Sequence, residues 1–332
     1  MSGLVLPVAE PAHVGQARSL ATTAARDEEL PAATVDRIAI AASELATNLL
    51  KYAQDGLFAI THGPLGLDLI ATDRGPGLRS VDESMRDGFS TTGSMGTGLG
   101  AVRRLADEFD VYSRLGAGTA VLARWLIGAP RWRGVRVGSV LFAAPGESVS
   151  GDGWTAVDAD GLVTIALTDG LGHGPAAAAA SAAAIGHVTA DPAASLPVLL
   201  AAMDEDPAAA RGSTVALVQL DLARGTLSFS GVGNVTARLF GPGETRETLV
   251  SVPGIVGRRQ RRGRRANPLV RPWSADSWLI MHTDGVSERW NAAECPGLLG
   301  HDPATVAGWL LGQHIRRRDD ACVLAIAGGE AS

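Results

Sequence analysis

Apolar residues recur with a helical period in the first part of the chain, which predicts helices over residues 11–26 and 34–53. At ~100° per residue, the apolar side chains of the second helix form a single stripe, made of Ile38, Ala42, Leu45 and Leu49. A third helix is predicted after residue 98. Strand-like segments lie on both sides of it, over residues 57–63, 65–73, 109–114 and 118–126. This alternation indicates an α/β domain.

In the second part of the chain, strongly apolar strand-like runs are followed by acidic residues. Asp169 follows the run over residues 162–167, Asp284 follows the run WLIMH, and a glycine comes directly after each acid. Asp152 lies in VSGDGW, and Asp319 and Asp320 precede a last strand. A single acid of this kind is usually a turn former. Repeated at strand ends, carboxylates from distant positions can surround one cavity, as a catalytic metal cluster requires.

The length of 332 residues fits roughly two domains of ~100–200 residues each, and a hydrophobic content of 46% is enough for two cores. The stretch GAPRWRGVRVG is rich in Gly, Pro and Arg and has neither helical nor strand periodicity. We therefore expect a domain over residues 1–128, a linker over 129–136 and a second domain over 137–332.

The charge and the cysteine content limit the functional classes. A net charge of −6 argues against a general nucleic-acid binder. Two cysteines, Cys295 and Cys322, cannot form a disulfide framework and fit a reducing cytosol. We expect no signal peptide, no membrane span and a cytoplasmic location. The run RRQRRGRR over 258–265 is either an RNA or membrane patch or, as the acidic chain favours, an exposed loop that could recognise a phosphoprotein.

Three local motifs in the first domain are weak one by one. Glu44, Asn48 and Lys51 share one helix face, which is most simply a solvated face. The sequence DRGPG supplies Asp73, Gly75 and Gly77, which alone form an ordinary turn. A later glycine-rich loop supplies Gly96, Gly98 and Gly100 directly before a helix. Glycines there let backbone N–H groups approach phosphates, and the helix dipole favours the negative charge.

The order of these motifs resembles the Bergerat ATP-binding fold of the GHKL superfamily, and within it the RsbT type of anti-sigma and stress-switch serine kinase. The stretches that carry the resemblance are VGQARSLA, ASELATNLLKYAQDG, DRGPG and GTGLGAVRRLADEF. It covers nearly all of residues 8–127 and implies an α/β sandwich. No phosphoacceptor-histidine helix precedes the motifs, so we expect transfer to a separate protein.

The resemblance also implies residue roles in the first domain. Asn48 would bind the Mg²⁺ that bridges the ATP phosphates, and Glu44 would be the base for the attacking hydroxyl. Asp73 would accept a hydrogen bond from the adenine amino group. The remaining cofactor-binding residues would let the backbone approach the base, cradle the phosphates or add positive charge: Gly75, Gly77, Gly96, Gly98, Gly100 and Lys51.

The second half resembles the PPM-type, metal-dependent Ser/Thr phosphatases, and more narrowly the SpoIIE-like and RsbX types. The stretches that occur in the family order, over about residues 134–328, are PGESVSGDGW, DGLGHGPAAAAAS, STVALVQLDLARGTLSFSGVGN, VPGIVGRR, TDGVSE and DDACVLAI. This resemblance implies an αββα sandwich with two Mn²⁺ or Mg²⁺ ions. Asp169 would bridge the ions with help from the Gly170 carbonyl. The remaining ligands would be Asp152, Asp284 and Asp319.

The chain departs from the PPM pattern at two places. Leu171 stands where eukaryotic members have a histidine after Asp-Gly, and His173 lies two residues later. We expect His173 to tether the turn rather than to act as an acid. Ala321 and Cys322 replace a larger residue and a threonine, and Cys322 is expected to be a small buried residue. Asp319 matches the family ligand better than Asp320.

Together the two halves predict a bifunctional bacterial signalling switch that phosphorylates and dephosphorylates one class of partner. By resemblance, the partner would be a STAS-domain antagonist or stressosome scaffold, with a downstream phosphatase or a sigma factor as further partners. Two alternatives stay open. The first is a phosphatase whose N-terminal domain only senses nucleotide, and the second is an anti-sigma factor that acts mainly by binding.

Overall fold

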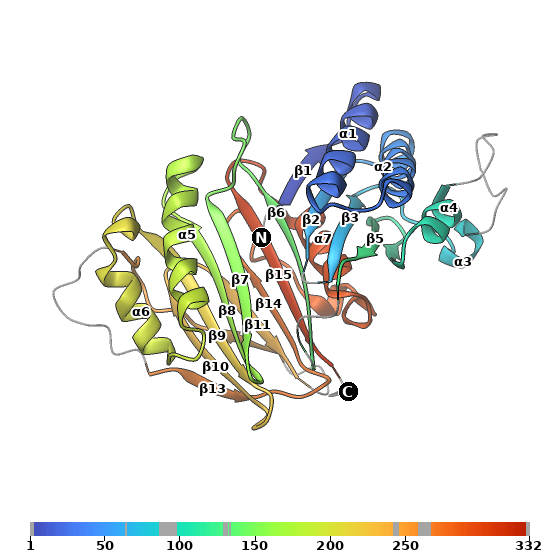
Figure 1. Cartoon of the computed structure of the whole chain (residues 1–332). Coiled ribbons are helices and arrows are strands. Elements are labelled where there is room, and N and C mark those ends of the chain that lie inside the picture. The colour runs from blue at the N-terminus through green and yellow to red at the C-terminus, as the bar shows by residue number, and fades with distance from the viewer. Residues whose placement is uncertain are drawn as a thin grey trace.

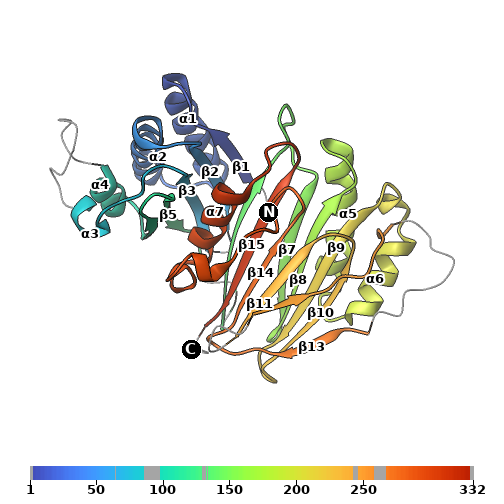
Figure 2. The same cartoon turned by 180° about the vertical axis from the view of Figure 1, so that it is seen from behind.

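The structure of the chain is a computed structural model, and it describes residues 3–63, 65–85, 98–128, 132, 134–241, 246–257 and 267–329. In this part of the chain, the strands form three five-stranded sheets. Figures 1 and 2 show helices on the two outer faces of the assembly and one further helix, α7, between the first sheet and its neighbour.

The first sheet is antiparallel, with the strand order β1–β2–β3–β5–β4. Its strands are β1 (Gly3–Pro7), β2 (Leu57–His62), β3 (Gly66–Asp73), β4 (Glu108–Arg114) and β5 (Gly118–Leu126). The helices of this region are α1 (Pro11–Asp27), α2 (Ala32–Tyr52), α3 (Val81–Ser84) and α4 (Gly98–Leu105). The predicted apolar stripe of α2 is buried against the sheet. Strand β1, at the sheet edge, was not predicted from the sequence.

The other two sheets lie face to face and enclose a second core. One has the order β13–β10–β9–β8–β7; its strands are β7 (Asp152–Ala159), β8 (Leu162–Gly170), β9 (Ser213–Asp221), β10 (Thr226–Val232) and β13 (Leu269–Pro272). The other has the order β12–β11–β14–β15–β6; its strands are β6 (Val135–Phe142), β11 (Thr236–Phe240), β12 (Arg246–Leu249), β14 (Trp278–His282) and β15 (Ala321–Gly328). Strand β6 begins at Val135, so the last two residues of the expected linker are paired in a sheet.

Helices cover the outer faces of these two sheets. Helices α5 (Pro175–Ala190) and α6 (Leu196–Glu205) lie on the β7–β10 sheet, with their own apolar cluster beneath them. Helix α7 (Pro303–His314) lies on the sheet that contains β6, β14 and β15. The result is the expected αββα sandwich, to which the N-terminal α/β sandwich is joined.

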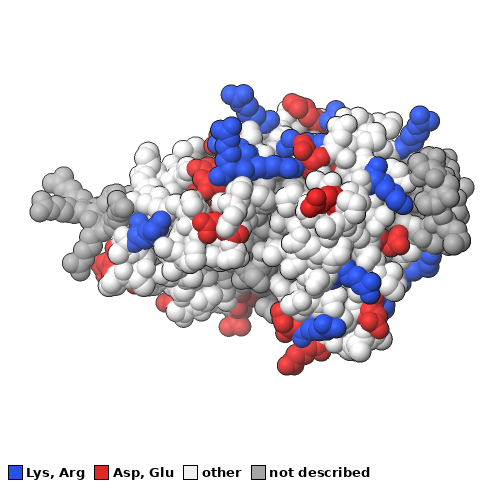
Figure 3. All heavy atoms as spheres, turned by 90° about the horizontal axis from the view of Figure 1, so that it is seen from above, with Lys and Arg blue, Asp and Glu red and all other residues white. Residues whose placement is uncertain are grey.

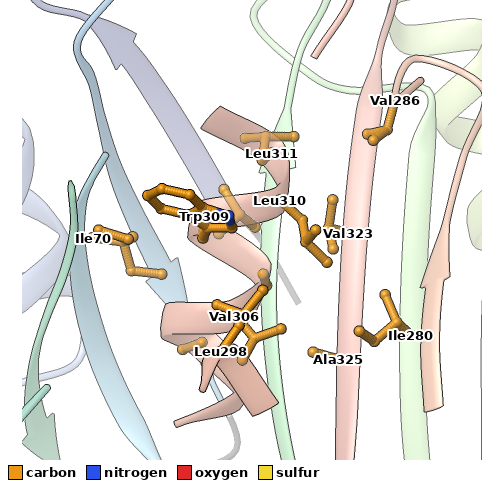
Figure 4. Packing of buried hydrophobic residues seen from close by; sticks show 14 of the residues in the cluster. Ile70, Ile280, Val286, Leu298, Val306, Trp309, Leu310, Leu311, Val323 and Ala325 are labelled. Carbon is orange, nitrogen blue, oxygen red and sulfur yellow. The ribbon is translucent and has the colours of Figure 1, made fainter. Parts of the chain in front are cut away.

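Helix α7 is covered on both sides. Its residues from Pro303 to Gly312 are all buried. Figure 4 shows Trp309 on the side of Ile70 from β3, whereas Leu310 points toward Val323 from β15. One continuous apolar cluster therefore joins the N-terminal sheet to the C-terminal sandwich through α7.

Two glycines let α7 approach the N-terminal sheet closely. A Cβ atom on Gly308 would overlap the Ile70 side chain, and one on Gly312 would overlap the Thr72 side chain. Because the two glycines are four residues apart, they lie on the same helix face. That face is pressed against β3 just before Asp73.

A buried ionic cluster crosses the same interface. The guanidinium of Arg124, which is 1% exposed, bonds both carboxylate oxygens of Asp68 at 2.7 and 2.9 Å. It also bonds Glu108 at 2.9 Å and the α7 N-cap residue Asp302 at 3.0 and 3.1 Å. These partners satisfy a charge that would otherwise be costly to bury.

Surface charges are mixed on the face seen from above in Figure 3. Lys and Arg side chains lie between Asp and Glu side chains there, and no broad basic field is visible among the residues described. The arginine-rich run over 258–265 lies outside the described residues.

Candidate functional sites

The polar face of α2 meets the start of α4. Asn48 is half-buried, and a Cβ atom on Gly98 would lie 3.5 Å from its Nδ2 and 3.6 Å from its Oδ1. Glu44 lies one helical turn earlier and is also half-buried, whereas Lys51 is exposed. Gly100 is buried in α4, and Gly96 lies outside the described residues. The structure thus brings Asn48 and Gly98 together, although they are fifty residues apart in sequence.

Asp73 ends β3 and faces the turn that follows it. Its Oδ1 accepts a hydrogen bond from the Gly75 N–H at 2.6 Å, which uses one of the two carboxylate oxygens. Burial raises the pKa of Asp73 to about 6, and the Gly75 bond partly offsets that rise. The carboxylate is therefore held in a fixed direction and is only partly solvated.

Gly75 and Gly77 are needed by the turn itself. A Cβ atom on Gly75 would lie 2.8 Å from the carbonyl oxygen of Tyr52, at the end of α2. Gly77 has a φ of +72°, and a Cβ atom there would overlap the Arg114 carbonyl. Both glycines let the turn pack closely against the ends of α2 and β4, so no side chain separates the backbone after Asp73 from these elements.

The acidic residues of the second half gather at one end of the sandwich. Asp152 begins β7 and pairs in register with Asp169 near the end of β8. Asp284 follows β14, and Asp319 and Asp320 precede β15. The sequence-predicted carboxylates are therefore brought together from four separate positions on the two facing sheets.

Crowding and burial shift the pKa values of these carboxyl groups upward. Burial, followed by the charges of Asp284, Asp319 and Asp320, raises the pKa of Asp169 to about 7. The pKa of Asp152 is raised well above its usual range by burial and by Asp169. For Asp284, burial and Asp319 raise the pKa, and Arg316 lowers it. A cation among these groups would relieve their mutual repulsion.

Asp319 and Asp320 have different environments. Asp320 is 4% exposed, and its two carboxylate oxygens accept backbone N–H bonds from Ala144 at 2.7 Å and Gly151 at 2.8 Å. Asp319 is exposed, and its Oδ1 accepts the Asp320 N–H at 2.9 Å. The carboxylate of Asp320 thus fixes the loops around β7, and Asp319 is the freer of the two.

Several neutral groups that the sequence analysis did not assign hold the acidic ones in place. The Thr283 hydroxyl donates to Asp152 at 2.6 Å and accepts the Cys322 N–H at 2.8 Å. Asn234 donates from its side chain to Asp284 at 2.7 Å. The motifs TDG and GVGN contain Thr283 and Asn234, but nothing in their spacing showed which acid each would meet. Cys322 is fully buried, as expected.

The turn after Asp169 is tied down from two sides. His173 Nδ1 lies 2.5 Å from Glu147 Oε1, in agreement with the tethering role expected for this histidine. Arg211 donates from Nε to the Leu171 carbonyl at 2.6 Å. At Gly170, a Cβ atom would overlap the backbone of Ala177 in α5. The turn can therefore lie flat beneath α5 only with glycine at that position.

The donor set fits a hard divalent cation. Carboxylate oxygens and a glycine carbonyl are ligands that Mg²⁺ and Mn²⁺ prefer. As they stand, no three His, Cys, Asp or Glu side chains among the described residues converge closely enough to hold one ion by themselves. Water molecules would therefore complete the coordination of any bound ion.

A separate cavity of about 460 Å³ lies at the opposite end of β8 from Asp169. It is lined in part by Asp160, Gln219, Asp221 and Arg224. None of the candidate catalytic, cofactor-binding or metal-binding residues lines it.

Comparison with known proteins supports the division seen in the motifs. Residues 8–125 match the model of the histidine kinase-like ATPase domain. Residues 159–327, half of the chain, match the model of Stage II sporulation protein E (SpoIIE). Both family assignments made from the sequence are confirmed.

One curated relative is the serine/threonine-protein kinase RsbT of Bacillus subtilis (strain 168). It is 45% identical over 117 residues, which cover 33% of this chain and 86% of that protein.

Two solved structures have the fold of the C-terminal part. One is RsbX in complex with magnesium, with a TM-score of 0.50 and 20% identity, covering 59% of this chain and 96% of that one. The other comes from work on the bacterial stressosome, with a TM-score of 0.50 and 24% identity, covering 58% of this chain and 98% of that one. Among the described residues, no helix is both long and apolar enough to cross a membrane.

Proposed function

The chain belongs to the SpoIIE family and carries a histidine kinase-like ATPase domain, and on this premise we propose that it is a signalling enzyme with two opposed activities. The N-terminal part transfers a phosphoryl group from ATP to a protein serine or threonine, and the C-terminal part removes that group by metal-dependent hydrolysis. The observation that carries the proposal is that one continuously packed chain contains both the polar face of α2 with Asn48, whose end packs against the Asp73 turn, and the carboxylate cluster around Asp169.

In the proposed N-terminal site, each polar residue has one task. Asp73 accepts the adenine amino group through the oxygen that Gly75 does not use, and Asn48 holds the Mg²⁺ that accompanies the phosphates. Glu44 acts as the base for the acceptor hydroxyl. Its place one turn before Asn48 on a rigid helix sets the distance between base and metal ligand. Gly96, Gly98 and Gly100 cradle the phosphates, and Lys51 adds positive charge.

In the C-terminal site, Asp152, Asp169, Asp284 and Asp319 hold two Mg²⁺ or Mn²⁺ ions, with the Gly170 carbonyl as a further ligand. When bound, such ions supply a water molecule of lowered pKa that can attack phosphorus in line. The support for Asp319 rather than Asp320 is that both oxygens of Asp320 are already bonded to backbone N–H groups. Thr283 and Asn234 orient Asp152 and Asp284.

For the protein substrate, we propose a STAS-domain partner of a bacterial stress-signalling module. A sigma factor or a downstream phosphatase would be a further partner in that module. The support is the 45% identity to the serine/threonine-protein kinase RsbT, together with the order of the phosphatase motifs. We place both reactions in the cytoplasm, where ATP is available and where the free thiols of Cys295 and Cys322 stay reduced.

The test is a two-stage assay on the full chain. The protein is incubated with [γ-³²P]ATP, Mg²⁺ and a candidate STAS protein, and the labelled partner is then chased with unlabelled ADP and Mn²⁺. We expect label to enter the partner in the first stage and to be released as inorganic phosphate in the second, and EDTA should stop that release. If no label enters the partner but the chain releases phosphate from partner that was phosphorylated by another kinase, it is a phosphatase with a nucleotide-sensing domain. Binding without either reaction would leave an anti-sigma factor.

A further inference from the structure

The end of α7 touches the turn that carries Asp73. The side-chain amide of Gln313 donates to the Asp73 carbonyl at 2.9 Å and to the Ala117 carbonyl at 3.0 Å. Arg74 donates from Nε to the Gly312 carbonyl and from Nη2 to the Gln313 carbonyl, both at 2.9 Å. Three hydrogen bonds therefore join the C-terminal end of α7 to Asp73 and Arg74, at the proposed adenine contact, and a fourth joins it to Ala117.

The last residue of α7 and the two residues after it are bonded to the loop after Asp284. The Ser287 N–H donates to the His314 carbonyl at 2.9 Å, and the Arg316 N–H donates to the Gly285 carbonyl at 2.8 Å. Ile315 and Val286 form an antiparallel bridge between these bonds. The loop that carries Asp284 is thus paired with residues 314–316.

Only a few residues then separate this pairing from Asp319. Six residues of extended chain span at most about 20 Å, so Gln313 and Asp319 cannot lie farther apart than that. On the way, Arg317 donates to the Asp55 carbonyl at 2.9 Å, in the loop that follows α2. We name residues 312–320 the connecting segment. It contacts the loops of both proposed sites and contains one of the proposed metal ligands.

We propose that the connecting segment couples the two sites, with Gln313 and Arg74 as the positioning residues, so that adenine nucleotide bound at Asp73 tightens metal binding at Asp284 and Asp319. This inference rests on the proposed function, since it assigns a regulator to the same two sites. The coupling is carried by hydrogen bonds between loops that are far apart in the sequence.

The sign of the coupling follows from order. A nucleotide that immobilises Asp73 also immobilises its backbone carbonyl and the neighbouring Arg74. These two groups are hydrogen-bonded to Gln313 and Gly312 at the end of α7. The connecting segment then has less freedom, and a metal ion that must immobilise Asp319 loses less conformational entropy on binding. By linkage, the metal must raise nucleotide affinity by the same factor.

The first test is amide hydrogen exchange on the full chain in EDTA, with and without saturating ADP. Because EDTA leaves no free divalent metal, any protection of the connecting segment by ADP must be transmitted through the protein from the nucleotide site. We expect about fivefold or greater slowing at residues 315–317 in the wild type. The slowing should be absent in Gln313→Met and Arg74→Met. It should persist in the matched control His301→Ala, which loses a 2.9 Å interface contact to Asp110 at the other end of α7.

The second test measures the Mn²⁺ concentration that half-activates p-nitrophenyl phosphate hydrolysis, with free Mn²⁺ fixed by a metal buffer. ADP should lower that concentration about fivefold, and GDP, which lacks the adenine amino group, should not. The ADP effect should vanish in Gln313→Met. Protection of residues 73–78 by ADP without any change at 312–320 or in metal activation would overturn the coupling and leave the proposed function standing. No protection of residues 73–78 would overturn the nucleotide site itself and the coupling with it.

Discussion

Gln313 and Asp73 are 240 residues apart in sequence, yet the Gln313 side-chain amide donates to the Asp73 backbone carbonyl at 2.9 Å. Gln313 lies at the end of a phosphatase-domain helix, and Asp73 is the residue proposed to recognise adenine. The contact means that the two halves are not independent units connected only by a linker. Mutations in one half can therefore be expected to affect the other through α7.

Replacing Glu44 with Gln should abolish phosphoryl transfer and leave ATP affinity within a few-fold of wild type. The reason is that the base acts on the acceptor hydroxyl and not on the nucleotide, and removing a general base typically costs about 10²–10⁴-fold in rate. Transfer to the partner and ATP binding by calorimetry should be measured on the same preparation. Normal labelling of the partner by Glu44→Gln would show that the base is elsewhere.

Replacing Asp169 with Asn should be the most damaging single change in the C-terminal site. The charges of Asp284, Asp319 and Asp320 all act on Asp169, and its carboxylate is proposed to serve two ions at once. Hydrolysis of p-nitrophenyl phosphate should require added Mn²⁺ or Mg²⁺, stop with EDTA, and fall by at least about 100-fold in the variant. Asp320→Asn is the matched comparison, because that residue bonds backbone N–H groups. Turnover that persists in EDTA would contradict a metal mechanism.

Nucleotide affinity should weaken as the pH falls through about 6, the pKa to which burial raises Asp73. Above that pH the free protein already has the carboxylate that accepts the adenine amino group. Below it, binding must first release the proton, so affinity should fall by up to about tenfold per pH unit. Binding of adenosine, which has no phosphates that titrate in this range, should be measured from pH 5 to 8. Asp73→Asn should bind weakly with no such dependence, and a flat wild-type profile would contradict the assignment.

The fold could be predicted where the signal was local. The apolar stripe of α2 predicted a helix. The apolar runs before Asp73 and Asp169 predicted strands, and the acids at their ends predicted two site residues. The acids that gather around Asp169 were found because strand ends with the same chemistry recur along the chain. The hydrogen-bond partner of each acid could not be predicted, because it depends on which loops of the two facing sheets meet. The bond from Thr283 to Asp152 is an example.

The role of α7 was not predicted, although its sequence contained a signal. The segment PATVAGWLLGQH has almost no polar face, and a helix that is apolar all round is buried on all sides. Periodicity identifies such a helix but says nothing about its partners. Gly308 and Gly312 fit against Ile70 and Thr72, which lie about 240 residues away. Arg124 and Asp68 likewise alternate with apolar strand residues, a pattern typical of a strand with one face toward solvent, but they are buried against each other.

Truncating Arg124 should destabilise the whole chain and not only its N-terminal part. Arg124→Met leaves the buried carboxylate of Asp68 without its bidentate partner, which typically costs about 3–5 kcal/mol in the free energy of unfolding. Arg224→Met is the control, because the Arg224–Asp221 pair is exposed and such pairs contribute about 0–1 kcal/mol. Urea unfolding should be followed by fluorescence. Equal midpoints for the two variants would show that the Arg124 cluster does not stabilise the interface.

The steady-state phosphorylation of the partner should not depend on how much of the enzyme is present. If both sites act on one partner, the modified fraction is set by the ratio of two rates, and both rates scale with the same protein concentration. The fraction should respond instead to the ATP/ADP ratio and to metal supply. Asp169→Asn should drive the partner to full modification, and Glu44→Gln should leave it unmodified. The measurement is a titration of wild-type enzyme against a fixed amount of STAS partner, read on a phosphate-affinity gel once the level is constant. A plateau that rises with enzyme, or one that Asp169→Asn leaves unchanged, would mean that the kinase and phosphatase sites serve different partners.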